Sequence, residues 1–449
     1  MGRASNGAGR FGLARLAYAR RFLQESPRHF RAAAERAPTP ALAAADLRTA
    51  ADAVYAIGHA SQAYDLLHES AARAREAGDG DAAAIALARA VVTATRFPGG
   101  FPAPVPRDRL DASLAEAAAA GTGAEVAAHL AAARVWHAEP APDPAMAGVA
   151  LAAARATGDP ALISGALDAL GTLAAQAGRL REAHRLSRER LDLLPLMDRR
   201  QPGYAAEILD LFHVAWLSAF AAGDLPAALA VAEAIRRDDL LGAHPYRATS
   251  KLVPALVLTG RFDEALEHAR SMWDGWERLG GPTAAWMSPG ASSVALAHGL
   301  RGDRGGYALW RERAIRATGV ANPKLARYNA SFTAFVEARV AVETGDGDPA
   351  AIVRRCFADF PMGWHETYAR AAGAELAVVA GLPDAAARLA AAMPDGDEND
   401  WAAACLARTA GRLRGDEAAL AAAVDGWERI DARFERARTL ALSVYSGPE

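Results

Sequence analysis

Three hexapeptides decide the fold of this chain: residues 178–183 read GRLREA, residues 223–228 read GDLPAA and residues 260–265 read GRFDEA. Each begins with a glycine that closes an Ala/Leu-rich stretch and ends with an alanine that opens the next one. Weaker forms begin at Gly302, Gly345, Gly381 and Gly415. Successive glycines are 34 to 45 residues apart, which is the period of stacked helix pairs. The sequence therefore predicts a solenoid of helix pairs.

Composition supports an all-α chain. The 449 residues are 52% hydrophobic and 23% charged, and alanine, the best helix former, dominates. We find no sustained alternation of apolar and polar residues and no Asn-Gly hairpin, so strands are not expected. A chain of this length is too long for one compact core, whereas a solenoid buries the apolar face of each unit against its neighbour.

Charge and hydropathy bear on partners and location. The formal net charge of −3 does not provide the basic footprint of a protein that binds nucleic acid through phosphates. No run of 18 apolar residues occurs, and the N-terminus lacks the apolar middle of a signal peptide. We therefore expect a cytoplasmic protein with no direct nucleic-acid or membrane partner.

Proline and glycine clusters divide the chain. We predict a disordered leader at residues 1–10, an N-terminal helical array at 11–138 and a C-terminal array at 145–449. The Pro-rich break at 139–144 separates the two arrays, and a Pro/Gly stretch at 97–106 is expected to be a non-helical loop. Within the first array, helices are expected at about 10–25 and 41–56.

A family resemblance is specific in the segment from about 164 to 195. We compared this segment with the 34-residue tetratricopeptide pattern. Leu167 and Leu170 fall on its positions for large residues, Gly171 and Ala183 on its positions for small residues, and Pro195 on its proline position. The hexapeptide at 178–183 resembles the inter-helix turn of that pattern. The resemblance implies an all-α, right-handed superhelical solenoid of about nine or ten degenerate tetratricopeptide-like helix pairs.

A second resemblance lies at the ends of two units. Residues 274–280 read DGWERLG and residues 425–431 read DGWERID. The latter phrase resembles the last helices of the tetratricopeptide sensor region in large, actinobacterial ATP-dependent transcriptional regulators of the LuxR and maltose-activator type. In that family the region binds an inducer or a protein. The resemblance implies a sensor region without the ATPase and DNA-binding domains.

Motifs for catalysis are missing from the sequence. Only Lys251 and Lys324 are lysines, and neither stands in the Gly-Lys-Ser/Thr context of a P-loop. We find no Gly-x-Ser-x-Gly elbow, no zinc-protease His pair and no Gly-x-Gly-x-x-Gly that follows a strand. Cys356 and Cys405 lack neighbouring ligands and are expected to be buried thiols. We expect no catalytic residue, no metal and no cofactor.

Two surfaces are candidates for binding. The tetratricopeptide register points six polar residues into a concave groove that could hold a charged partner: Asp168, Gln176, Asp210, His213, Arg247 and Ser250. An aromatic stretch could line a pocket for a small apolar molecule, and its residues are Trp273, Trp276, Trp286, His298 and Trp310. A solvated polar face and a tryptophan-filled core are the structural alternatives.

These observations favour a non-enzymatic helical-repeat module that binds a ligand or protein and acts in regulation, as a sensor or scaffold. Its partner would be a protein or peptide, or a small-molecule effector. The alternative is an accessory protein of a biosynthetic pathway that binds a small apolar molecule near the Trp-rich segment 270–310.

Overall fold

The computed structural model describes residues 11–18, 25–96, 101, 103–138, 143–318, 329–360 and 363–444. Within these ranges the regular structure consists of α-helices and short 3-10 helices, without a strand. The all-α prediction is confirmed. The predicted leader at 1–10 lies outside the described residues. The chain forms two compact units: unit 1 comprises Met1–Leu173 and Arg185–Val214, and unit 2 comprises Ala174–His184 and Ala215–Glu449. Each is described by itself.

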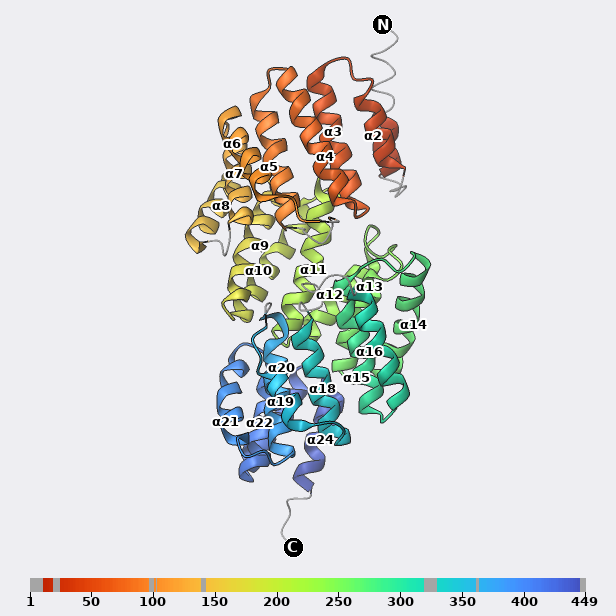
Figure 1. The fold of residues 1–449 in the computed structure, drawn as a ribbon, viewed down its shortest axis with the longest axis vertical. Coiled ribbons are helices and arrows are strands. Elements are labelled where there is room, and N and C mark those ends of the chain that lie inside the picture. The colour runs from red at the N-terminus through yellow and green to blue at the C-terminus, as the bar shows by residue number, and fades with distance from the viewer. Residues whose placement is uncertain are drawn as a thin grey trace. The chain divides into compact units, whose positions relative to one another are not determined.

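Unit 1 is built from consecutive helices that pack on their neighbours in sequence (Figure 1). After a helical segment at 11–18, its helices are α2 (Ser26–Ala34), α3 (Pro40–Ala56), α4 (Ala60–Glu76), α5 (Gly80–Arg96), α6 (Arg107–Ala120), α7 (Ala124–His137) and α8 (Pro144–Thr157). The helix predicted at 41–56 is confirmed as α3. The helix predicted at 10–25 is helical at 11–18, and residues 19–24 lie outside the described part. The helix α2 is not among those expected from the sequence; it has a proline in its first turn.

Three helices contribute residues to both units. They are α9 (Pro160–Gln176), α10 (Leu180–Asp192) and α11 (Ala205–Ala221), with the 3-10 turns η2 (Leu194–Leu196) and η3 (Pro202–Tyr204) between the last two. The predicted boundary at 139–144 remains a prediction, since residues 139–142 lie outside the described part. The Pro/Gly stretch at 97–106 is non-helical wherever it is described.

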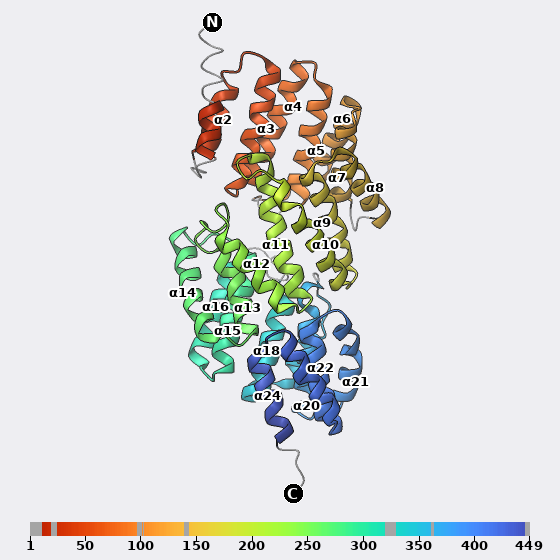
Figure 2. The same ribbon diagram turned by 180° about the vertical axis from the view of Figure 1, so that it is seen from behind.

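Unit 2 shows the helix-pair pattern most clearly (Figures 1 and 2). The helices α13, α15, α18, α20 and α22 are the first helices of successive pairs. Each packs on its own partner, and α13, α15, α18 and α20 also pack on the first helix of the next pair. The elements are α12 (Leu225–Arg237), α13 (Arg247–Leu258), α14 (Phe262–Arg278), η4 (Ala285–Met287), α15 (Ser288–Leu300), α16 (Arg304–Thr318), α18 (Ala330–Thr344), α19 (Pro349–Cys356), η5 (Gly363–His365), α20 (Glu366–Val379), α21 (Ala385–Ala392), η6 (Met393–Asp397), α22 (Asp400–Arg414), α23 (Glu417–Arg429) and α24 (Arg433–Val444). This contact pattern confirms a solenoid of helix pairs.

The predicted turn glycines all adopt the left-handed conformation that glycine tolerates best. Their φ angles lie between 64° and 79° at Gly178, Gly223, Gly260, Gly302, Gly345, Gly381 and Gly415. At Gly260 the N–H of Arg261 donates to the Leu256 carbonyl at 2.8 Å, and the Gly260 N–H donates to Val257 at 3.0 Å. This is the Schellman end of a helix, so the glycine stops α13 and turns the chain into α14.

The alanines of the three hexapeptides mark tight helix crossings. Ala183 is 1% exposed, and Ala228 and Ala265 are fully buried in the core of unit 2. A larger side chain there would have to displace a neighbouring helix, because protein interiors are close-packed.

The repeated DGWER phrase has a structural cause in both places. Trp276 and Trp427 are buried, and the indole N–H of Trp276 donates to the Pro282 carbonyl while that of Trp427 donates to the Thr439 hydroxyl. The preceding glycine permits a close helix contact: a Cβ at Gly275 would lie 2.5 Å from the Pro245 carbonyl oxygen. The phrase therefore fixes the end of its helix against the chain that follows it.

Candidate functional site

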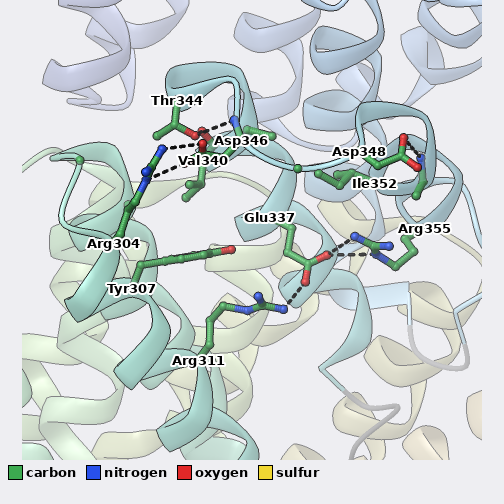
Figure 3. A pocket seen from close by; sticks show the side chains of 15 residues that line it. Arg304, Tyr307, Arg311, Glu337, Val340, Thr344, Asp346, Asp348, Ile352 and Arg355 are labelled. Atoms are coloured by element: carbon green, nitrogen blue, oxygen red, sulfur yellow. Dashed lines mark hydrogen bonds and ion pairs between the residues drawn. The ribbon is translucent and has the colours of Figure 1, made fainter.

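An open groove of about 740 Å³ lies in unit 2 along α16, α18 and α19 (Figure 3). Val340 on α18, Ile352 on α19 and the ring of Tyr307 on α16 supply its apolar lining. Gly345, in the left-handed conformation, ends α18, and the Asp348 carboxylate caps α19 by accepting a hydrogen bond from the Ala351 N–H at 3.2 Å. The turn between these helices thus forms one rim of the groove.

The middle of the groove carries a shared ion pair. The Glu337 carboxylate on α18 accepts hydrogen bonds from Arg311 on α16 and from Arg355 on α19, whose Nη2 lies 2.8 Å and whose Nε lies 3.0 Å from Oε2 (Figure 3). Glu337 is 13% exposed, but the arginines are 44% and 54% exposed. Because each guanidinium has five N–H donors, one carboxylate cannot use all of them. Donors and one net positive charge therefore remain for an incoming anion.

The rim formed by the turn between α18 and α19 carries a further ion pair. The Arg304 Nη2 lies 2.7 Å from Asp346 Oδ1, and the same turn also carries the capping carboxylate of Asp348 (Figure 3). The groove is thus cationic around Glu337 and acidic near Asp346. Such a gradient orients a partner along the groove.

A buried ion network in unit 1 takes up two of the residues predicted for the concave groove. Arg190 on α10 is 1% exposed, and it lies 2.6 Å from Asp168 Oδ1, 2.8 Å from Glu207 Oε1 and 2.6 Å from Asp210 Oδ2. Arg96 on α5 pairs with the same three carboxylates. Asp168 and Asp210 are therefore internal structural partners: both oxygens of Asp168 and the Oδ2 of Asp210 accept hydrogen bonds from the two arginines.

The electrostatics of this unit 1 ion network follow from burial and two cations. Burial opposes the charges of Glu207 and Asp210, but Arg96 and Arg190 hold the pKa of both carboxyls below the usual range. Burial raises the pKa of Asp168 to about 6 against the attraction of the same arginines. Two guanidiniums cannot neutralise three carboxylates, so one of the three, Asp168, takes up a proton more readily than the other two.

The other predicted groove residues differ in their burial. His213 belongs to unit 1 and is partly buried. In unit 2, Gln176 is exposed, Arg247 is partly buried, and Ser250 is buried with its hydroxyl donating to the Arg247 carbonyl at 2.8 Å. Ser250 therefore presents no free hydroxyl to a ligand.

The predicted aromatic pocket divides into separate environments. Trp273, Trp276 and Trp310 are at most 5% exposed, and the ring centroids of Trp273 lie 4.6 Å from Trp276 and 5.9 Å from Trp310. These three rings fill the core, where they compensate for the small side chains around them. His298 pairs instead with Asp303 at 2.8 Å. Trp286, on η4, is partly exposed and stacks on Tyr246 at 5.3 Å.

A second buried ion network, in unit 2, was not anticipated. Arg408 on α22 lies 2.8 Å from Glu375 on α20 and 2.7 Å from Glu435 on α24, and Arg339 on α18 lies 2.8 Å from Glu435. Burial opposes the charge of Glu375, but Arg408 and Arg339 lower its pKa to about 2. The signal that could have revealed this network is a single charge inside an apolar helical run, as in ACLARTA around Arg408.

Both cysteines are buried, as predicted, and burial raises the pKa of the Cys356 thiol to about 12. In the described part of the chain, no group of three or more His, Cys, Asp or Glu side chains is arranged to hold a metal ion. No helix among the described residues is both long and apolar enough to span a bilayer.

Comparisons with known proteins concern architecture alone. No protein-family model matches the chain, and the search of curated proteins gave no match. Among solved structures, the Rap protein complexed with competence and sporulation factor has a TM-score of 0.46 at 10% identity, over 82% of this chain and 98% of that chain. Yeast Tom70 has a TM-score of 0.35 at 9% identity, over 98% and 96% of the two chains. The function is therefore argued from this chain's own side chains.

Proposed function

We propose that this chain is a non-enzymatic binding module acting in regulation, and that the groove along α16, α18 and α19 receives an acidic segment of a protein or peptide partner. One observation carries the proposal: Arg311 and Arg355 share the single carboxylate of Glu337 and keep unused donors at the surface. A partner carboxylate can bond to either guanidinium without breaking the contact to Glu337.

The lining of the groove also suits a peptide. Val340 and Ile352 provide an apolar surface for a side chain, while the charged rims fix the direction of the segment. The arginines contribute little to folding, because exposed ion pairs are worth at most about 1 kcal/mol. They are therefore available for binding at small cost to the fold.

The regulatory part of the proposal rests on the phrase DGWERID at residues 425–431, which resembles the last helices of the sensor region of LuxR-type and maltose-activator-type regulators. The non-enzymatic part rests on the character of the titratable groups. The strongly perturbed carboxyls of the two ion networks are bonded to buried arginines inside the helix packing, and they do not converge on the groove.

The test is selection of ligands for the groove from a phage-displayed library of random peptides against the full chain. Recovered peptides are expected to be acidic. Their affinity, measured by fluorescence anisotropy, should fall by about 10-fold to 100-fold in Arg355→Glu, the usual worth of a hydrogen bond to an ionised group. The same affinity should weaken as added salt screens the exposed charges.

Arg354→Glu is the matched control. Arg354 is the preceding residue on α19, is exposed and does not line the groove, so this variant should bind as the wild type does. If acidic peptides bind Arg355→Glu and the wild type equally, or if selection yields no acidic peptide, the groove is not the binding site.

A further inference from the structure

Lys251 is a buried amine without a counter-ion. It lies on α13, is 3% exposed, and is one of two lysines in the chain. Among the described residues no carboxylate forms an ion pair with it, and the charged group that acts on it most is another cation, Arg247, one turn earlier on the same helix. Arg247 has an interaction of its own. By contrast, each buried arginine of the two ion networks contacts at least two carboxylates.

Aromatic rings surround this amine. Its Nζ lies 4.5 Å from the ring centroid of Trp216, on α11, and 5.7 Å from that of Trp286, on η4. Trp286 stacks on Tyr246, with the centroids 5.3 Å apart and the planes 13° apart. Ring faces attract a cation, but they do not replace a counter-charge in a buried site. His365 is also close enough for the charge of Lys251 to lower its pKa. We call Lys251, Trp216, Trp286, Tyr246 and His365 the Lys251 cluster.

Other polar atoms of the cluster also lack a partner. The Trp216 indole N–H and the His365 Nδ1 are buried without a hydrogen-bond partner among the described residues. Trp216 is 1% exposed and His365 is 2% exposed, so water outside the protein does not satisfy them. Unpaired buried polar groups cost free energy, so a ligand that bonds to them would recover part of that cost.

One ring of the cluster reaches the surface. Trp286 is partly exposed, and His244, whose ring lies 6.2 Å from that of Trp286, is also partly exposed. The cluster therefore extends from a buried amine to a ring that solvent partly reaches.

We propose that the Lys251 cluster is a binding site for a small molecule that combines one carboxylate with a flat apolar body. The carboxylate supplies the counter-charge of Lys251 and accepts the free hydrogen bond of Trp216. The apolar body lies along the rings of Trp286 and Tyr246. This site is distinct from the groove, and its ligand is not the peptide partner.

The charges of the site favour a monoanion. Burial and the nearby cation keep His365 neutral, with its pKa lowered to about 3, so His365 adds no positive charge. Burial lowers the pKa of Lys251 to about 7, and an entering carboxylate would restore its charge. A phosphate dianion would leave a second charge without a free cation, because Arg247 is already engaged.

The test uses the small number of lysines. The full chain is labelled with 13C-lysine, which gives two side-chain signals in NMR, and Lys324→Arg assigns them. Phenylacetate is the probe, phenylacetamide is the neutral control of the same shape, and acetate is the control without an apolar body. We expect phenylacetate, and neither of the two control compounds, to raise the titration midpoint of Lys251 by a pH unit or more. The titration midpoint of Lys324 should stay unchanged.

Affinity is measured by calorimetry with matched variants. Lys251→Met should weaken phenylacetate binding about tenfold or more, whereas Lys324→Met should bind as the wild type does. Trp286→Ala should weaken binding while leaving the free-state titration of Lys251 near neutral pH. The proposal is overturned if phenylacetate at millimolar concentration leaves the Lys251 signal unchanged, if phenylacetamide binds equally well, or if Lys251→Met keeps the affinity.

Discussion

Replacing Lys251 by methionine should stabilise the free protein. The ordinary pKa of lysine is 10.5, and burial lowers that of Lys251 to about 7. At about 1.4 kcal/mol for each pH unit, holding this amine in its site costs on the order of 4 kcal/mol of folding free energy at neutral pH. Methionine has a similar length and no charge, so it removes this cost without opening a cavity.

Part of the gain is offset by lost contacts. The ammonium over the Trp216 ring contributes about 1–2 kcal/mol when it is charged, and methionine lacks that attraction. We therefore expect the free energy of unfolding to rise by about 2–3 kcal/mol. Such a rise is unusual for a core substitution, since most of them destabilise.

The pH dependence of stability gives an independent check that the buried amine of Lys251 destabilises the folded chain at neutral pH. Because the pKa of Lys251 is lower in the folded chain, the unfolded chain holds more protons between about pH 7 and pH 10.5. The contribution of Lys251 therefore makes the wild type more stable as pH rises through this window. Lys251→Met should lose that part of the slope.

Urea unfolding followed by circular dichroism, at about pH 7 and pH 9, measures both effects. Arg408→Met is the control, because Arg408 is a cation that is equally buried but bonded to Glu375 and Glu435. Removing one partner of such a network should cost about 3–5 kcal/mol. If Lys251→Met loses stability as Arg408→Met does, then Lys251 has a counter-charge and the reasoning is wrong.

Three other changes test the packing and the ion networks. Ala228→Leu should lower the free energy of unfolding by about 1–3 kcal/mol, because the alanine is fully buried at a helix crossing; equal urea midpoints for variant and wild type would contradict this. Gly275→Ala should also destabilise, by about 1–3 kcal/mol, because the new methyl group would meet the Pro245 carbonyl oxygen at 2.5 Å, and an unchanged melting temperature would count against that contact. The pKa of Glu375 is lowered to about 2, so its contribution to the free energy of unfolding is present above about pH 4.5 and is lost as the pH falls toward 2. Glu375→Gln should therefore be less stable than the wild type at neutral pH and should lose less stability on acidification. Identical acid unfolding transitions of variant and wild type would refute the role of Glu375 as a charged partner of the buried arginines.

The fold could be predicted in large part because its determinants are local. A glycine that takes a φ of 79°, as Gly260 does, stops a helix whatever the rest of the chain does. The spacing of such glycines then fixes the length of each helix pair, and buried alanines such as Ala228 mark where the helices cross. The extra helix α2 was missed because its only local sign is a proline in its first turn.

The candidate sites could be predicted only in part. The tetratricopeptide register predicts that Asp168 and Asp210 lie on corresponding faces of their helices. It gives no information on Arg96, which lies on a helix distant in sequence and pairs with both carboxylates. The tryptophan count likewise did not separate Trp273, which fills the core, from Trp286, which is partly exposed.

The sequence by itself determined the class of this protein: helices from alanine content, pairs from the glycine period, and turns from backbone conformations that few residues other than glycine tolerate. Only the tertiary structure decided which charges are paired. Arg408 and Lys251 both lie in apolar helical stretches, yet one meets two carboxylates and the other meets aromatic rings. The physical reason is that helical propensity depends on near neighbours in sequence, whereas the free energy of a buried charge depends on whichever groups distant helices place within a few ångströms of it.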